Sequence, residues 1–169
     1  ALLAIFAGAG AEIVMNQWAS TFAEKALAMP KLTGDLLGMC LFAAMIGVGR
    51  MLYGSFGSRI NMNKVLIGSS ALAAVLYLVV SLSPVNSISL IACALCGFAV
   101  ALLWPDTLVI CSERYPLAGA WMFAILAAAG DIGAAFAPWL TGRVVDAGLR
   151  SELTASFASL YKVTQEQAA

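Results

Sequence analysis

The sequence predicts an all-α membrane protein, and three observations lead to this fold class. Hydrophobic residues make up 62% of the 169 residues and charged residues only 11%, whereas soluble domains carry about 25% charged residues. The apolar residues form continuous runs long enough to cross a bilayer as helices, which takes about 20 residues. They do not show the alternating segments of about ten residues that are typical of a membrane β-barrel.

Five apolar runs reach spanning length, and breaker residues such as Pro30, Asn61, Pro84 and Pro116 separate them. We expect a five-helix transmembrane bundle over residues 1–141, opening inside its first helix. The expected spans are 1–23, 34–56, 65–82, 88–111 and 119–141.

Residues 142–169 are more polar and form a second predicted region. Leu153, Phe157, Leu160 and Tyr161 recur at helical spacing, which indicates an amphipathic helix at the membrane surface. We interpret this region as an extramembrane connection that leads to a last span missing from this sequence. The alternative is a solvated loop that leads to the same missing span.

The composition argues against several function classes. The chain has no histidine, which removes Ser-His-Asp and Cys-His catalysis, H-E-x-x-H zinc sites and histidine-ligated haem. Nine basic residues balance nine acidic ones, so nothing favours nucleic acid as a partner. Cys93 and Cys96 form a C-x-x-C motif inside an apolar run, where we expect buried packing residues rather than a redox pair. We therefore expect no enzyme, no metal and no cofactor.

Four of the five spans contain one ionisable residue away from their ends: Glu12, Arg50, Asp106 and Asp131. Each costs about 2.5–3.5 kcal/mol at the centre of a membrane helix. Counting residues from the helix ends places Arg50 and Asp106 roughly 8–9 Å from the same membrane face. Opposite charges at equal depth predict a structural ion pair. The alternative is that Arg50 extends its guanidinium to the lipid headgroups.

Glu12 and Asp131 lie near the bilayer midplane by the same count, about 15 Å deep. With no basic residue expected at their level, they are candidate substrate-binding or coupling residues for a proton or cation. The alternative is a neutral acid hydrogen-bonded to a neighbouring helix. Asn16 shares the helix face of Glu12 and is a candidate for a hydrogen bond to solute. Trp104 either lines the same cavity or serves only in packing.

Prolines and small residues predict where the spans deviate from straight helices. Pro105 has no N–H to donate to the carbonyl of Ala101, so we expect a kink there and a free carbonyl for water or ligand. Gly130, Gly133 and Pro138 permit bending of the last span. The small residues beside Asp131 either allow another helix to approach closely or leave room for water and substrate.

Four stretches are informative in their order and spacing: Gly10-Ala11-Glu12 with Asn16-Gln17-Trp18, Gly49-Arg50 with Gly54 and Arg59, Gly97 with Trp104-Pro105, and Gly130-Asp131-Ile132-Gly133-Ala134 with Pro138 and Gly142. Together they resemble the C-terminal half of major facilitator superfamily transporters of the sugar-permease-like kind. Gly49-Arg50, Gly54 and Arg59 are similar to the signature loop between the second and third helices of that half. Asp106 is a departure, because the family usually has a small residue after Trp-Pro.

The resemblance implies a twelve-helix carrier of two six-helix halves, of which this chain supplies five helices of the second half. Each half contains inverted three-helix repeats. The signature loop would face the cytoplasm, which charge alone does not decide, since the two sides carry four and five basic residues. The implied partners are the missing N-terminal six-helix half, the lipid bilayer and a small-molecule solute.

The expected function is secondary active transport of a small polar solute, sugar-like or another metabolite, by alternating access. We expect it to be coupled to a proton or cation, as in a symporter, in a multi-pass protein of the plasma membrane. One alternative is a membrane-embedded aspartyl-type protease that uses Asp106 and Asp131. The other is a non-transporting membrane scaffold, which the charges inside the spans disfavour.

Overall fold

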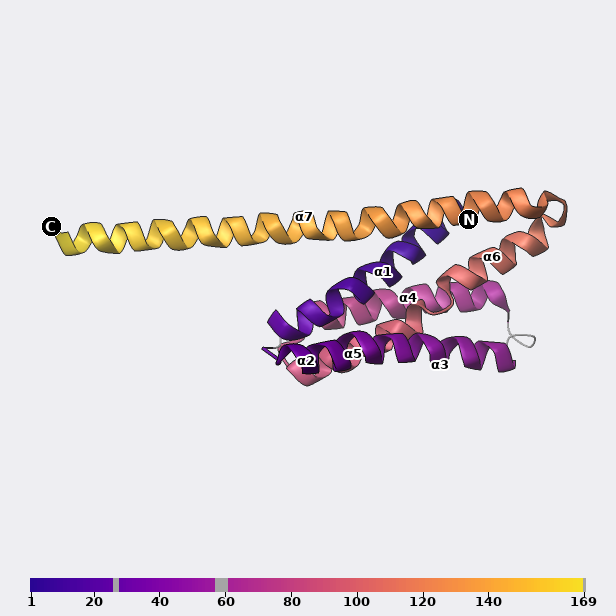
Figure 1. Cartoon of the computed structure of the whole chain (residues 1–169), viewed down its shortest axis with the longest axis horizontal. Helices are drawn as coiled ribbons and strands as arrows, with labels where there is room; N and C mark the ends of the chain where they lie inside the picture. Colours follow the sequence, from indigo (N-terminus) through magenta and orange to yellow (C-terminus); the bar gives the residue numbers. More distant parts are fainter. Residues whose placement is uncertain (26–27, 57–60, 169) are drawn as a thin grey trace.

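The computed structural model describes residues 1–25, 28–56 and 61–168, with backbone only at 25, 56 and 157–168. All regular structure in these residues is helical, as predicted. Within the same residues, five helical segments are long and apolar enough to cross a membrane (Figure 1). They are Leu2–Glu24, Lys31–Ser55, Met62–Leu82, Asn86–Arg114 and Pro116–Ser156.

The first two spans pack closely because glycines of the second span face the backbone of the first. The first span is α1 (Leu2–Lys25). A Cβ on Gly38 would lie 2.8 Å from the carbonyl oxygen of Ala19 in α1, so only glycine fits there. The second span starts after Pro30, three residues earlier than expected, and contains one π-helical stretch. Its parts are α2 (Lys31–Gly34), η1 (Asp35–Cys40) and α3 (Leu41–Phe56).

The third and fourth spans begin and end at local signals. The side chain of Asn61 accepts a hydrogen bond from the N–H of Lys64 and caps the third span. That span ends at Leu82, and its C-cap Ser83 is the residue before Pro84. The fourth span is interrupted at Ala101 and Leu102, one turn before Pro105, as the missing N–H predicts. The helices are α4 (Met62–Leu82), α5 (Asn86–Val100) and α6 (Leu103–Arg114).

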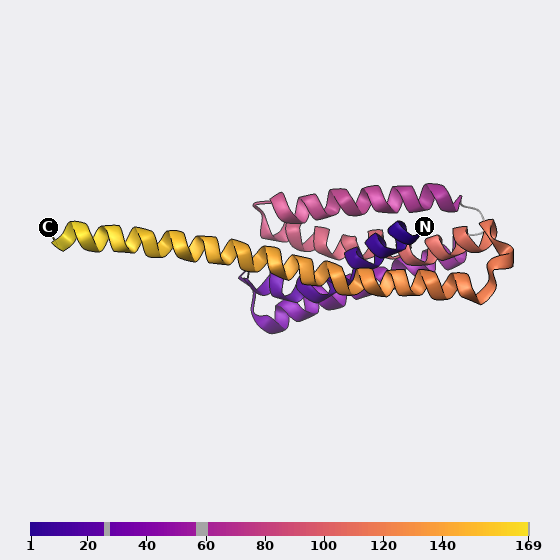
Figure 2. The same cartoon turned by 90° about the horizontal axis from the view of Figure 1, so that it is seen from above.

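The last helix is much longer than predicted. After η3 (Pro116–Ala118), α7 (Gly119–Ala168) runs without interruption, and Pro138 lies inside it. Gly142 still lies beside the ring of Trp18 in α1. Beyond that level the helix projects past the other helices (Figures 1 and 2).

The predicted change at residue 142 therefore coincides with the point where α7 leaves the bundle, not with a break in the helix. Leu153 is exposed on the projecting part. The side chains of Phe157, Leu160 and Tyr161 lie outside the described ones, and the extramembrane position of this region stays a prediction.

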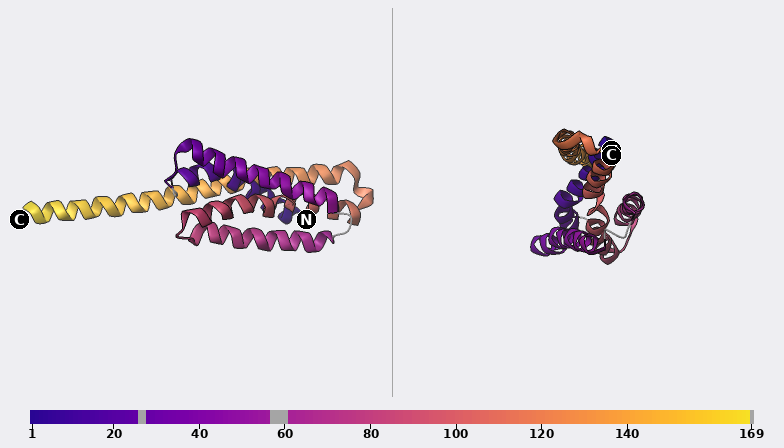
Figure 3. Two further views of the ribbon diagram at one scale, coloured as in Figure 1. Left: turned by 90° about the horizontal axis from the view of Figure 1, so that it is seen from below. Right: turned by 90° about the vertical axis from the view of Figure 1, so that its right-hand side faces the viewer.

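The helices pack in a way that brings α1 and α6 to the centre. Both run obliquely between α7 and the layer formed by α3, α4 and α5 (Figure 3). The main apolar core joins Met15 of α1, Phe42 of α3 and Val100 of α5. Cys93 and Cys96 are free and buried in this core, consistent with packing residues.

Candidate functional site

The crossing of α1 and α7 determines where the two midspan acids lie. A Cβ on Gly133 would collide with the backbone of Phe6, and one on Gly10 would lie 2.8 Å from the Cβ of Ala137. The two helices therefore approach each other backbone to backbone, as small residues allow between membrane helices. Glu12 and Asp131 are each two residues from one of these glycines, so the crossing brings both acids to the same part of the bundle.

A cavity of about 420 Å³ lies beside this crossing, within the range of small-molecule sites, about 300–1,000 Å³. We call it the charged cavity, because three of the four ionisable residues inside the membrane-length helices line it. Its lining residues are Ala9, Glu12 and Ile13 of α1, Arg50 of α3, Trp104 and Pro105 of α6, and Asp131 and Ala134 of α7.

Arg50 connects two walls of the charged cavity. Its Nη2 lies 3.3 Å from Oε1 of Glu12, and its Nε donates a hydrogen bond to the carbonyl oxygen of Ala101 at 3.2 Å. That carbonyl is the one that Pro105 leaves without a helical donor. Gly49 makes the approach possible, because a Cβ there would lie 2.8 Å from the Cβ of Ala101. The Gly49-Arg50 pair thus joins α3 to the interruption between α5 and α6.

The predicted ion pair between Arg50 and Asp106 is wrong, and so is the expectation that Glu12 has no basic partner. Residue counts along separate helices give equal depths only when the helices are parallel, and both α6 and α1 are oblique to α3 (Figure 1). The long arginine side chain also has a second acceptor in the carbonyl of Ala101. Together these features direct Arg50 to Glu12.

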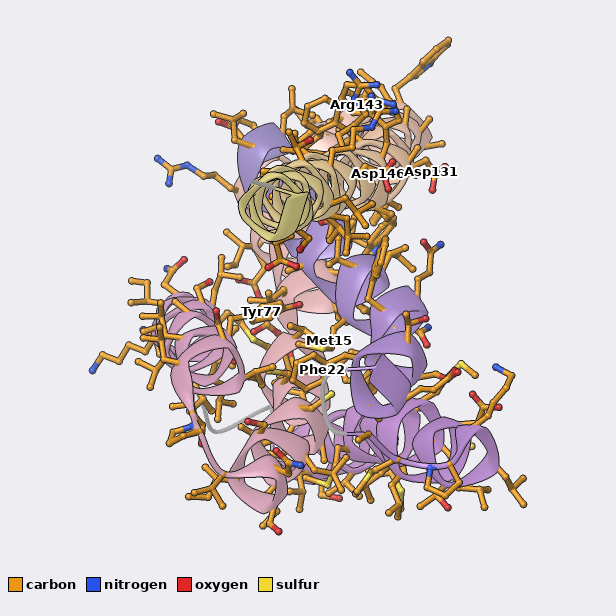
Figure 4. All side chains as sticks on the ribbon, turned by 90° about the vertical axis from the view of Figure 1, so that its left-hand side faces the viewer. Met15, Phe22, Tyr77, Asp131, Arg143 and Asp146 are labelled. Atoms are coloured by element: carbon orange, nitrogen blue, oxygen red, sulfur yellow. The ribbon has the colours of Figure 1, made fainter. Side chains whose placement is uncertain are left out.

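Trp104 both packs and lines the cavity. A Cβ on Gly130 would lie 2.5 Å from its six-membered ring, so glycine is required in α7 where the indole lies. The neighbouring Asp131 is exposed and makes no ion pair or hydrogen bond within the described part of the chain. Because Asp131 lines the charged cavity without such a partner, its carboxylate is available to a ligand there. Asp131 lies on the same side of α7 as Asp146 (Figure 4).

Other predicted site residues are not brought into this cavity. Asn16 is half-buried and does not line it. A Cβ on Gly8, four residues before Glu12, would meet Leu103 of α6 instead. Gly54 faces open space, since a Cβ there would have nothing within 4 Å, and Arg59 lies outside the described residues. Because α1 crosses the bundle obliquely, successive residues on one of its faces lie against different helices.

Asp106 is the ionisable residue whose environment sequence reasoning missed. Its side chain is 0% exposed, and neither carboxyl oxygen has a hydrogen-bond partner among the described residues. It does not line the charged cavity. It therefore shares no proton with Asp131, which an aspartyl dyad would require. The only sequence signal was its place after Trp-Pro, where the resembled family has a small residue.

A larger cavity, about 580 Å³, lies between α1 and α4 and carries no carboxylate. Its polar groups include Tyr77, whose hydroxyl donates to the carbonyl oxygen of Ala11 at 2.6 Å, and it is otherwise lined mainly by apolar side chains. No cluster of three or more His, Cys, Asp or Glu residues that suits a metal occurs in residues 1–25, 28–56 and 61–168. The charged cavity is therefore the candidate site.

No protein-family model, curated protein or solved structure matches this chain. Its resemblance to major facilitator transporters therefore stays a prediction. The charged cavity and the helices that surround it are the basis on which a function can be assigned.

Proposed function

We propose that this chain forms part of a secondary transporter that moves a small polar solute across a membrane by alternating access, coupled to a proton or cation. The observation that supports this most is the charged cavity. Glu12, Arg50 and Asp131 come from three separate spans and line one space. Ionisable residues inside membrane spans mark substrate or ion pathways by default. A scaffold has no use for such an arrangement.

The charge balance of the cavity supports coupling. Glu12 and Arg50 compensate each other, whereas Asp131 leaves one negative charge without a partner in the described residues. A proton or cation at Asp131 would neutralise the site. The paired Glu12 and Arg50 offer an acceptor and donors to a polar solute, and Trp104 offers an apolar surface beside them.

The position of Arg50 suggests how binding would change the fold. Its guanidinium connects α1 to the interruption between α5 and α6. A solute or proton that binds the carboxylate of Glu12 in place of Arg50 would weaken this connection and let α6 move relative to α1. Interrupted helices beside a midspan site are typical of secondary transporters.

On the basis of the resemblance to major facilitator transporters, we also propose an architecture for the whole carrier. The chain would be the C-terminal part of a major facilitator carrier in the plasma membrane, with the turn between α3 and α4 in the cytoplasm. The N-terminal six helices would supply the other half of the cavity, and a further helix would complete the inverted three-helix repeats.

The test is transport by the carrier that contains this chain, reconstituted in liposomes with an imposed proton gradient and a panel of monosaccharides and other small polar metabolites. Glu12→Gln should lower uptake about tenfold or more, because an interaction with a charged group contributes about 1.5–3 kcal/mol. Asp131→Asn should abolish gradient-driven accumulation but keep downhill exchange.

Asp146→Asn is the matched control, because Asp146 lies on the same side of α7 (Figure 4) and follows Gly142, the level at which the helix leaves the bundle. It should transport like the unmodified protein. Uptake and pH dependence that stay unchanged in both Glu12→Gln and Asp131→Asn would contradict the proposed function.

A further inference from the structure

We propose that Asp106 is a proton-binding site separate from the charged cavity, and that its carboxyl group carries a proton in the conformation described here. The side chain is 0% exposed, and both oxygens lack hydrogen-bond partners in the described chain. An ionised carboxylate without a partner in such surroundings is far more costly than its neutral form. A buried group of this kind needs an explanation, and a bound proton provides it.

Among the side chains that the structure describes, no cation is paired with Asp106. α6 packs against α1, α4, α5 and α7. Arg50 is bound to Glu12 and Ala101, and Asp131 faces the charged cavity. Lys64 of α4 is exposed. None of the other described ionisable side chains on these helices forms a hydrogen bond with Asp106. They are Glu24 of α1, Tyr77 of α4, Cys93 and Cys96 of α5, Cys111, Glu113 and Arg114 of α6, and Asp146, Arg143, Arg150 and Glu152 of α7.

Tyr53 of α3 is one ionisable residue within electrostatic range of Asp106. Its hydroxyl is directed to the sulfur of Met62, at 2.9 Å, and not to the carboxyl group. A neutral phenol supplies no positive charge. The environment of Asp106 therefore favours the uncharged acid.

Asp106 also lies between residues that line two different cavities. The residues before it, Trp104 and Pro105, line the charged cavity. The residue after it, Thr107, lines a second cavity of about 250 Å³ near the ends of the helices, together with Asn63 and others. Asp106 thus lies on the stretch of α6 between two cavities. A rotation of α6 at the interruption before Leu103 would turn its carboxyl group toward either one.

Infrared spectroscopy of the chain in lipid nanodiscs, with ¹³C at the side-chain carboxyl carbon of aspartate, tests this directly. At neutral pH we expect the isotope-shifted C=O stretch of a protonated aspartate without hydrogen bonds. Asp106→Asn should remove that band, whereas Asp131→Asn and Asp146→Asn should retain it. Asp106→Leu serves as a second variant if the asparagine variant does not fold.

Absence of the protonated-aspartate band in the unmodified chain would overturn the proposal, and so would its persistence in Asp106→Asn or Asp106→Leu. The measurement uses no solute and no transport assay, so its result is independent of the proposed function. The role of this proton in transport does rest on that function. There, Asp106→Asn should lower the number of protons moved per solute.

Discussion

Arg50 and Asp106 are both ionisable residues inside membrane-length helices, yet their environments are opposite. The Arg50 side chain is 49% exposed beside the charged cavity and has partners on α1 and at the interruption between α5 and α6. The Asp106 side chain is 0% exposed and has none among the described residues. The difference shows two ways in which a bundle of apolar, membrane-length helices accommodates an ionisable group: with partners, or, as we propose for Asp106, by keeping it neutral.

Chain geometry accounts for the difference. The arginine side chain is long enough to reach both Glu12 and the carbonyl that Pro105 leaves free. The aspartate side chain is short and lies within the packed part of α6. Its own helix offers it no donor, because the N–H groups nearby are used within the helix or are absent at proline.

The largest effect is expected from the glycine that brings Arg50 to its partners. Gly49→Leu places side-chain atoms where a Cβ already lies 2.8 Å from Ala101, which should cost about 3 kcal/mol of unfolding free energy. Unfolding in detergent, followed by circular dichroism, measures it. Gly54→Leu is the control on the same helix, because nothing lies within 4 Å of its Cβ. Equal losses in both variants would show that close approach at Gly49 is unimportant.

A smaller loss is expected from Arg50 itself. Arg50→Met leaves the Glu12 carboxylate and the carbonyl of Ala101 without their donor, which should lower the unfolding free energy by about 1–2 kcal/mol, given its partial exposure. Arg143→Met, at an exposed position of α7 (Figure 4), should change the unfolding free energy by less than about 0.5 kcal/mol. If the two arginine variants are equally stable, the partners of Arg50 contribute nothing to the fold.

The smallest effect is expected at Asp106. Asp106→Leu removes no hydrogen bond and replaces a buried polar group by an apolar one, so the unfolding free energy should stay unchanged or rise by about 1 kcal/mol. Thermal unfolding in the same detergent gives the comparison with Arg50→Met. A loss as large as that of Arg50→Met would show that Asp106 has a partner and that the contrast between the two residues is wrong.

Local features of the fold could be predicted from the sequence. Continuous apolar runs indicated the five membrane-length segments, because each run alone has to satisfy its backbone as a helix. The interruption before Leu103 followed from Pro105, which acts one turn away. The length of α7 did not follow, because the more polar composition after residue 141 does not stop a helix. No proline occurs between 139 and 169, and the helix continues.

The candidate site could be predicted only in part. The sequence indicated which ionisable residues needed an explanation, and the structure places Glu12, Asp131 and Trp104 around one cavity. It did not indicate the partner of Arg50, since that depends on the tilt of α1. It also did not show that Asp106 is unpartnered, because the depth of a residue in its helix says nothing about the neighbours it faces.

Arg50 pairs with Glu12 on the wall of the charged cavity, and under the proposed transport function a charge exchange tests this pairing most directly. Glu12→Arg and Arg50→Glu should each abolish uptake in the reconstituted carrier, because each puts two like charges on side chains whose opposite charges now lie 3.3 Å apart. The double variant restores opposite charges and should recover part of the uptake. If the double variant is as inactive as the single ones while Arg50→Asp combined with Asp106→Arg recovers uptake, the pairing described here is wrong.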